Sequence, residues 1–129
     1  MSSFPKQQFF EAAFAGDFSI VKGLAVDPTL DVNWKEPRSG WTPFHGACSR
    51  GRVEVVMFLL ANPEVDVNMP NENEATPFLV ACFNGHKEVV SLFLANIRID
   101  INKRNVNEAT PFYIACQKGH KEVVSLLLT

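Results

Sequence analysis

The chain has 129 residues, of which 47% are hydrophobic and 20% charged, values typical of one globular domain rather than a disordered chain. Its formal net charge of -2 at pH 7 excludes a chain-wide basic surface, so we expect no nucleic-acid partner. No segment approaches the roughly 20 apolar residues that span a bilayer, and the N-terminus lacks a signal-peptide pattern. We therefore expect a soluble protein without membrane association, in the cytoplasm or alternatively in the nucleus.

A fixed interval of 34 residues recurs along the chain. It separates successive cysteines, Thr-Pro pairs, glycines and Val-Val pairs, as at Cys48, Cys82 and Cys116. Self-similarity at this length predicts a solenoid of stacked supersecondary units. The first unit, residues 4–33, lacks Thr-Pro and is predicted to cap the stack. Two full units follow at residues 34–68 and 69–102, and an incomplete fourth unit at residues 103–129.

Each later unit is predicted to contain two short helices. In the third unit the hydroxyl of Thr76 can cap free backbone N–H groups, and the proline after it loses no hydrogen bond at the first helical position. Gly85 can adopt the left-handed conformation that ends a helix. A second helix follows, with an apolar stripe at Val89, Val90, Phe93 and Leu94. Helices of about two turns are unstable alone, so neighbouring units must pack on one another.

Three stretches carry a family resemblance: "TPFHGACSRGRVEVVMFLL", "TPFLVACFNGHKEVVSLFL" and "TPFYIACQKGHKEVVSLLL". They resemble the ankyrin repeat, whose pattern is T-P-L-H-x-A followed by G-H and an apolar stripe. The resemblance implies an all-α solenoid of helix-turn-helix pairs with projecting hairpin loops, and a protein-protein interaction module without catalysis or cofactor. The family's histidine survives only at His45 and its hairpin glycine only at Gly40, since Glu74 and Glu108 replace the glycine later.

The cysteines and the repeated histidines do not indicate an enzyme or a metal site. Equivalent positions of stacked helices lie roughly 8–10 Å apart, too far for a disulfide or a shared zinc ion. We expect the cysteines to fill small buried positions. His86 and His120 follow a glycine in the turn, and we expect them to hydrogen-bond the neighbouring repeat, because no nucleophile recurs beside them.

Differences between the near-identical third and fourth units predict where a partner protein binds. Phe83 becomes Gln117 and Asn84 becomes Lys118 at the end of the first helix. The resemblance places this position on the concave surface, which the family uses with the hairpin tips for protein binding. The predicted partner-binding residues are Arg38, Ser39, Trp41, Ser49, Arg50, Glu72, Asn73, Phe83, Asn84, Val106, Asn107, Gln117 and Lys118. Trp41, Arg50 and Phe83 are the predicted centre, extended by Phe14 and Trp34.

Two alternatives remain open at this point. Trp34 and Trp41 could instead pack the hairpin of the second unit against its neighbour. The whole chain could be a scaffold or oligomerisation segment of a larger multidomain protein, because the chain ends on "SLLLT" without the polar outer face of a terminal cap. We expect Leu126–Leu128 to be only partly covered, with self-association or further repeats at this end.

Overall fold

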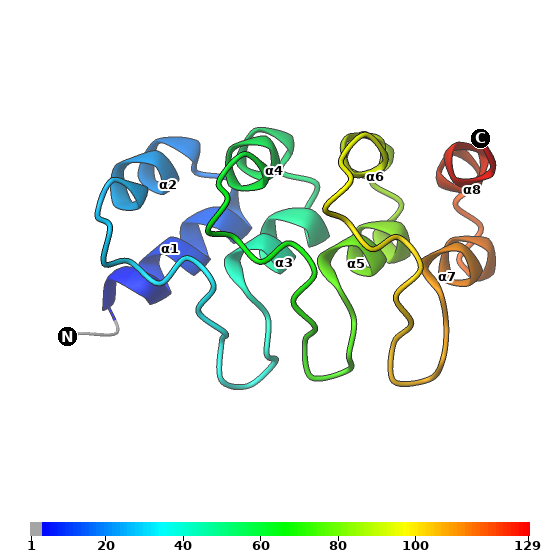
Figure 1. Cartoon of the computed structure of the whole chain (residues 1–129), viewed down its shortest axis with the longest axis horizontal. Helices are drawn as coiled ribbons and strands as arrows, with labels where there is room; N and C mark the ends of the chain where they lie inside the picture. The colour runs from blue at the N-terminus through cyan, green and yellow to red at the C-terminus, as the bar shows by residue number, and fades with distance from the viewer. Residues whose placement is uncertain (1–3) are drawn as a thin grey trace.

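The computed structural model describes residues 4–129, and every regular element among them is an α-helix. The helices are α1 (Phe4–Ala15), α2 (Phe18–Ala25), α3 (Pro43–Ser49), α4 (Val53–Leu60), α5 (Pro77–Asn84), α6 (Lys87–Leu94), α7 (Pro111–Gln117) and α8 (Lys121–Leu128). They form four antiparallel pairs stacked in chain order (Figure 1). An inner row contains α1, α3, α5 and α7, an outer row contains the other four, and the hairpins project beyond the inner row. The predicted all-α solenoid is confirmed.

The helix boundaries follow from local chemistry. The side chains of Thr42, Thr76 and Thr110 each accept a hydrogen bond from the backbone N–H three residues on, and a proline begins each helix. Gly85 ends α5 with a φ of 73°, as predicted. The N-termini of α3, α5 and α7 are therefore each stabilised by a threonine cap and a proline at the first helical position.

The core lies between the two rows of helices. Phe93 from the outer row packs against two inner-row rings, with centroids 5.5 Å from Phe44 and 5.8 Å from Phe78. All three side chains are buried. Burying each ring contributes about 1.5–3 kcal/mol, so stability comes from contacts between helix pairs more than from any single helix.

A ladder of hydrogen bonds joins each helix pair to the preceding one. Arg52 Nε donates to the Phe14 carbonyl at 3.2 Å, and His86 Nε2 donates to the Ser49 carbonyl at 2.7 Å. His120 continues the series with a 2.8 Å bond from Nε2 to the carbonyl of Phe83. The predicted structural role of both turn histidines is confirmed, and Arg52 serves the same role where the second unit lacks the histidine.

A second ladder runs through the loops after the outer helices. The Asn33 side chain donates to the Glu64 carbonyl and accepts from the Asp66 N–H, both at 2.8 Å. Asn68 makes the equivalent pair of bonds to Arg98 and Asp100 one repeat later. Each repeat is thus fixed to the next at two separate places.

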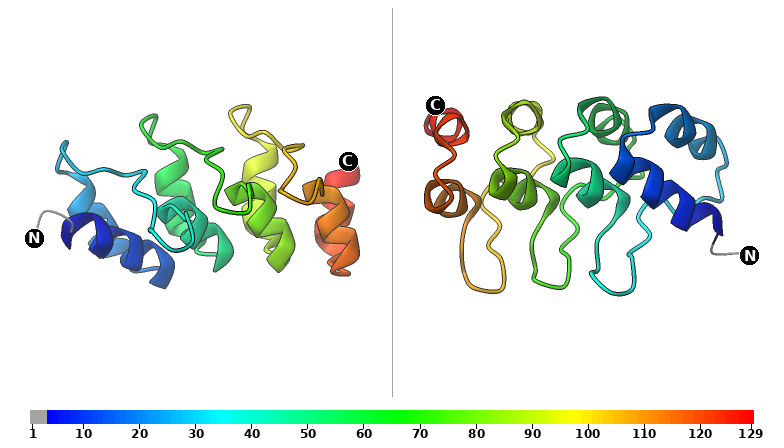
Figure 2. Two further views of the ribbon diagram at one scale, coloured as in Figure 1. Left: turned by 90° about the horizontal axis from the view of Figure 1, so that it is seen from below. Right: turned by 180° about the vertical axis from the view of Figure 1, so that it is seen from behind.

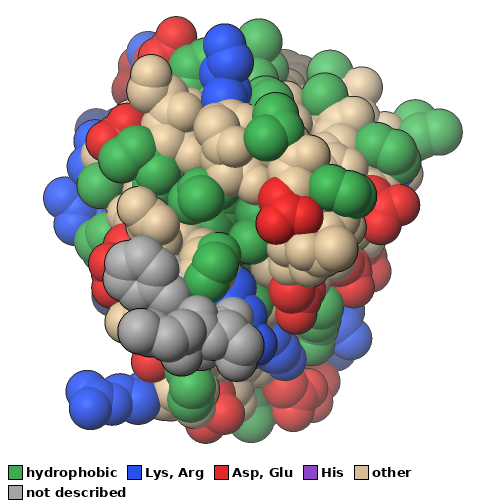
Figure 3. All heavy atoms as spheres, turned by 90° about the vertical axis from the view of Figure 1, so that its left-hand side faces the viewer, with side chains coloured by type: hydrophobic (Ala, Val, Ile, Leu, Met, Phe, Trp, Pro, Cys, Tyr) green, Lys and Arg blue, Asp and Glu red, His purple; other side chains and the backbone are tan. Residues whose placement is uncertain are grey.

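The α1–α2 pair lies at one end of the stack and the α7–α8 pair at the other (Figure 2), and these ends differ in their side chains. At the α1 end, charged side chains of both signs are interspersed with apolar ones (Figure 3). At the α8 end, Phe112 is 41% exposed although the equivalent Phe44 and Phe78 are buried. Leu126 and Leu127 are half-buried and Leu128 is 71% exposed, so the predicted partial coverage of this segment is confirmed.

One cysteine prediction is wrong. Cys48 and Cys82 are fully buried, as expected, but Cys116 is exposed. A cysteine at this position is covered by the inner helix of the following repeat, and within residues 4–129 no helix follows α8 to cover Cys116. The burial of this position is therefore a property of the neighbouring repeat and not of the residue's own helix.

Candidate partner-binding groove

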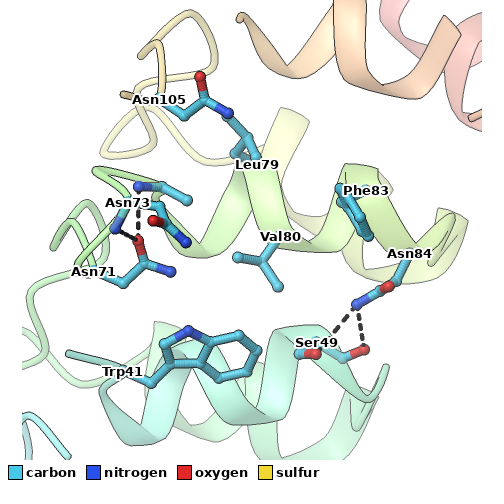
Figure 4. A pocket seen from close by; sticks show the side chains of 10 residues that line it. Trp41, Ser49, Asn71, Asn73, Leu79, Val80, Phe83, Asn84 and Asn105 are labelled. Atoms are coloured by element: carbon cyan, nitrogen blue, oxygen red, sulfur yellow. Dashed lines mark hydrogen bonds between the residues drawn. The ribbon is translucent and has the colours of Figure 1, made fainter. Parts of the chain in front are cut away.

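A groove of about 370 Å³ lies where the inner helices α3 and α5 meet the hairpins (Figure 4). Its lining combines apolar side chains with carboxamides and a hydroxyl, and includes no charged residue. The lining residues are Trp41, Ser49, Asn71, Asn73, Ala75, Leu79, Val80, Phe83, Asn84 and Asn105. Grooves with apolar walls and a few convergent polar groups are the usual form of a binding site.

Trp41 forms one wall of the groove. The equivalent residues of the next two units are Ala75 and Ala109, so the large indole faces a space that the following repeat leaves open. The indole is half-buried and its centroid lies 6.0 Å from the His45 ring. Trp41 also packs against the buried cluster that contains Leu79 and Val80 of the third unit, which is the contact with the neighbouring unit that the alternative expected.

Phe83 forms the far wall, near the C-terminal end of α5. It is 43% exposed, and Lys118 Nζ lies 4.6 Å from the centre of its ring. Two repeats earlier Arg50 lies over the Phe14 ring at 5.0 Å. These helix-end side chains therefore make inter-repeat contacts as well as facing solvent.

Between the second and third units the equivalent contact is a hydrogen-bonded polar pair. Asn84 Nδ2 donates to the Ser49 carbonyl at 3.0 Å and to Ser49 Oγ at 3.1 Å (Figure 4). Phe14, Ser49 and Phe83 occupy equivalent positions, and each contacts a side chain of the following repeat that suits it chemically. The difference between Asn84 and Lys118 is therefore not independent of folding, because each contacts the preceding repeat.

Two asparagines on the hairpin side of the groove are held by hydrogen bonds to the hairpin backbone. Asn71 Oδ1 accepts from the backbone N–H groups of Asn73 and Ala75, at 2.8 and 2.9 Å. Asn105 makes the same two bonds in the next hairpin, at 2.9 and 3.0 Å. The Val106 N–H also donates to the Asn73 carbonyl at 2.8 Å, which ties the two hairpins together. The carboxamides are consequently held in one orientation.

Five predicted binding residues line this groove: Trp41, Ser49, Asn73, Phe83 and Asn84. The others lie outside its lining: Arg38, Ser39, Glu72, Val106 and Asn107 in the hairpins, and Arg50, Gln117 and Lys118 at or next to the inner-helix ends. Trp34 lines a separate depression with Arg38, and its ring packs edge-on against Phe10 at 6.1 Å. The structure thus separates Trp34 from Trp41 and Phe83.

Sequence reasoning missed the asparagines and the apolar floor of the groove. Asn71 and Asn105 are 34 residues apart, so the repeat interval could have identified them as equivalent hairpin positions. Leu79 and Val80 lie at the base of the groove, and both are buried. Their apolar character was expected, but their contribution to a groove depends on the open space left by Ala75.

Burial determines the protonation of the groups nearest the core. It raises the pKa of Cys82 to about 12 and also raises the pKa of Cys48. Both thiols are therefore protonated at neutral pH, and a protonated thiol is a poor nucleophile. Burial also lowers the pKa of His45 to about 4, so its imidazole is neutral.

Residues 4–129 form neither a cluster of metal-binding side chains nor a membrane-spanning helix. No three His, Cys, Asp or Glu side chains in this part of the chain gather closely enough to hold a metal ion. None of the described helices is both long and apolar enough to cross a membrane.

The fold defines a class: a helical repeat solenoid, here with a groove between its inner helices and hairpins. Residues 9–105 match the family model described as "Ankyrin repeats (3 copies)", and residues 87–128 match "Ankyrin repeats (many copies)". The chain belongs to the ankyrin-repeat family. It is 40% identical over 55 residues to ankyrin repeat domain-containing protein 40 of Mus musculus and of Homo sapiens. The match covers 43% of this chain and 15% of each relative.

Proposed function

We propose that the chain is a non-catalytic interaction module that binds a partner protein through its groove. Ankyrin repeats are generally protein-protein interaction modules, and the observation that supports this particular surface is the groove itself. Trp41 and Phe83 form its two walls, and they are aromatic residues of the kind that dominate protein interfaces. Polar groups between them can orient a bound chain.

The experiment uses two substitutions that the chain already tolerates in other repeats. Trp41→Ala introduces the residue of the next two units, and Phe83→Gln introduces the residue of the fourth unit. Both variants serve as baits for affinity capture from the source cell, beside the unchanged chain. Circular dichroism melts establish that each bait is folded.

A matched control tests whether loss of binding is specific to the groove. Met57 is exposed on the outer helix α4, and the equivalent residues of the next two units are Ser91 and Ser125. We expect Met57→Ser to retain the captured partner while the two groove variants lose it. A partner that all baits hold equally would refute the groove as the binding surface.

We also propose a second role for the end face formed by α7 and α8, packing against a further ankyrin-type helix pair. The supporting observation is the exposure of Phe112, Cys116 and Leu128, whereas Phe44 and Cys48 are buried at equivalent positions of the second unit. This role corresponds to a scaffold or oligomerisation segment of a larger protein. The helix pair could belong to a second copy or to the same polypeptide.

Sedimentation equilibrium distinguishes these two sources. A mass that doubles with concentration, and returns to the monomer in Leu128→Lys, identifies a second copy. A monomer in which Cys116 is protected from thiol reagents, when the protein is purified from the source cell, identifies a helix pair of the same polypeptide. The second role would be contradicted by a monomer whose Cys116 reacts with thiol reagents both in the 129-residue chain and in the protein purified from the source cell.

A further inference from the structure

The groove offers more hydrogen-bond donors than acceptors. Because Asn71 and Asn105 use their Oδ1 atoms on the hairpin backbone, each presents its Nδ2 group to a ligand. These two groups and the Trp41 indole N–H have no hydrogen-bond partner within residues 4–129. Among the lining side chains, the carboxamide oxygens of Asn73 and Asn84 accept no hydrogen bond within residues 4–129, while Ser49 Oγ already accepts one from Asn84 Nδ2.

The donors have fixed directions. An asparagine whose oxygen accepts two backbone N–H groups cannot rotate without losing both bonds. Asn71 is buried and its Nδ2 group faces the groove, toward Trp41 and Val80 (Figure 4). Preorganised donors favour a ligand that presents carbonyl oxygens at matching places.

A ligand that fits this lining is rich in carbonyl groups and poor in N–H groups. Proline is the residue that supplies a backbone carbonyl without a backbone N–H. Its ring also packs well on aromatic side chains, and aromatic-lined grooves are the usual receptors of proline-rich segments. Trp41 and Phe83 provide such side chains here.

The spacing of the donors favours the same ligand. Asn71 and Asn105 occupy equivalent places in successive repeats, so they lie about one helix-packing distance apart, roughly 8–10 Å. A polyproline II helix repeats every three residues with a rise of about 3.1 Å per residue, so carbonyls on one side recur about every 9 Å. In a β-strand, carbonyls on one side recur about every 6.6 Å, which does not match.

We propose that the groove binds a proline-rich segment of its partner in the polyproline II conformation. Carbonyls three residues apart accept from Asn71 Nδ2 and Asn105 Nδ2, and the Trp41 indole N–H contacts a third carbonyl. An apolar side chain of the segment lies against Leu79 and Val80. This inference rests on the proposed function of the groove and names the chemistry of its ligand.

Two nine-residue peptides with neutral ends provide the probes. One is acetyl-(Pro-Pro-Leu)3-amide, and the other is acetyl-(Gly-Gly-Leu)3-amide, which keeps the leucine spacing but has backbone N–H groups and no polyproline II preference. Each is titrated into the ¹⁵N-labelled chain and followed by NMR. We expect shifts at the Trp41 indole N–H and at the Asn71 and Asn105 carboxamides, with binding at least tenfold tighter for the proline peptide.

Isosteric variants test the donors. Asn71→Asp and Asn105→Asp keep an oxygen for the hairpin N–H groups and remove the donating NH2 group. The control is Asn96→Asp, because Asn96 Oδ1 accepts from the Arg98 N–H in a loop that does not line the groove. We expect the first two variants to weaken binding of the proline peptide at least tenfold, and the control to change it less than twofold.

The outcomes separate this inference from the proposed function. Equal binding of the glycine peptide, no shift at the groove, or unchanged affinity in both folded donor variants would overturn the ligand class. If capture of the partner still depends on Trp41 and Phe83 in that case, the groove remains the binding surface. Proline-peptide binding at the groove, with capture independent of both residues, would support the ligand class and overturn the proposed function alone.

Discussion

His45 is expected to make the stability of the fold depend on pH, and the effect can be tested by His45→Leu. His45 lies in the first turn of α3 and is fully buried. The Thr42 N–H donates to its Nδ1 at 3.1 Å, so this nitrogen carries no proton, and Nε2 donates to the Ala75 carbonyl at 2.9 Å. A second proton on Nδ1 would face the Thr42 N–H and break the capping box.

The magnitude follows from the shift in pKa. Burial is the largest cause and lowers the pKa of His45 from 6.5 to about 4 in the folded chain. Between these values the unfolded chain binds more protons than the folded chain, so stability rises with pH in this window and is lost as the pH falls through it. At about 1.4 kcal/mol per pKa unit, the full loss is about 3 kcal/mol, of which about 2 kcal/mol is lost between pH 7 and pH 5.

The assay is urea unfolding followed by circular dichroism at pH 7, 6 and 5. Leucine occupies the equivalent position at Leu79, where it is buried, so His45→Leu keeps an apolar side chain that this fold accommodates. We expect the variant to be about 1–2 kcal/mol less stable at pH 7, because the capping box and the bond to Ala75 are lost. The difference between the two proteins should disappear toward pH 5.

Parallel curves for the two proteins would refute this reasoning. So would an NMR titration that gives His45 a pKa near 6.5 in the folded chain. His86 and His120 remain in both proteins and therefore cancel in the comparison.

Three further predictions concern the backbone and the end face. Glu74 has a φ of 59°, so Glu74→Gly should stabilise the chain by about 0.5–1 kcal/mol in urea unfolding; an unchanged midpoint would contradict strain at this residue. Gly85→Ala should be more destabilising than Gly119→Ala by about 1–2 kcal/mol. Both glycines have a φ of 73°, but a Cβ at Gly85 would lie 2.6 Å from His120 Nδ1 and one at Gly119 would contact nothing; equal losses would argue against the ladder contact. Ellman's reagent should react rapidly with Cys116 and not with the two buried cysteines of the native chain, and rapid reaction of more than one thiol would contradict their burial.

The regular part of the fold was predictable because its signals are local. Thr76 caps a helix through its own hydroxyl, and Gly85 ends one through its own φ. The repeat interval extends these local signals along the whole chain. The structural role of His86 and His120 also followed, because their recurrence in each turn pointed to the neighbouring repeat.

The groove was only partly predictable because it depends on differences between neighbours. Trp41 lines an open space since Ala75 is small at the equivalent position, and no pattern within a single unit contains that information. The exposure of Cys116 has the same origin. The orientation of the Asn71 carboxamide depends on two hairpin N–H groups, so it can be recognised only once the folded hairpin is known.

The matched pairs at the inner-helix ends have a consequence for the order of the repeats. Arg50 meets the Phe14 ring, Asn84 meets the Ser49 hydroxyl and Lys118 meets the Phe83 ring. A chain in which the second and third units exchanged places would set an amide over an aromatic ring and leave a cation without one. These contacts therefore favour one order of the repeats, although the buried residues of the repeats are nearly the same.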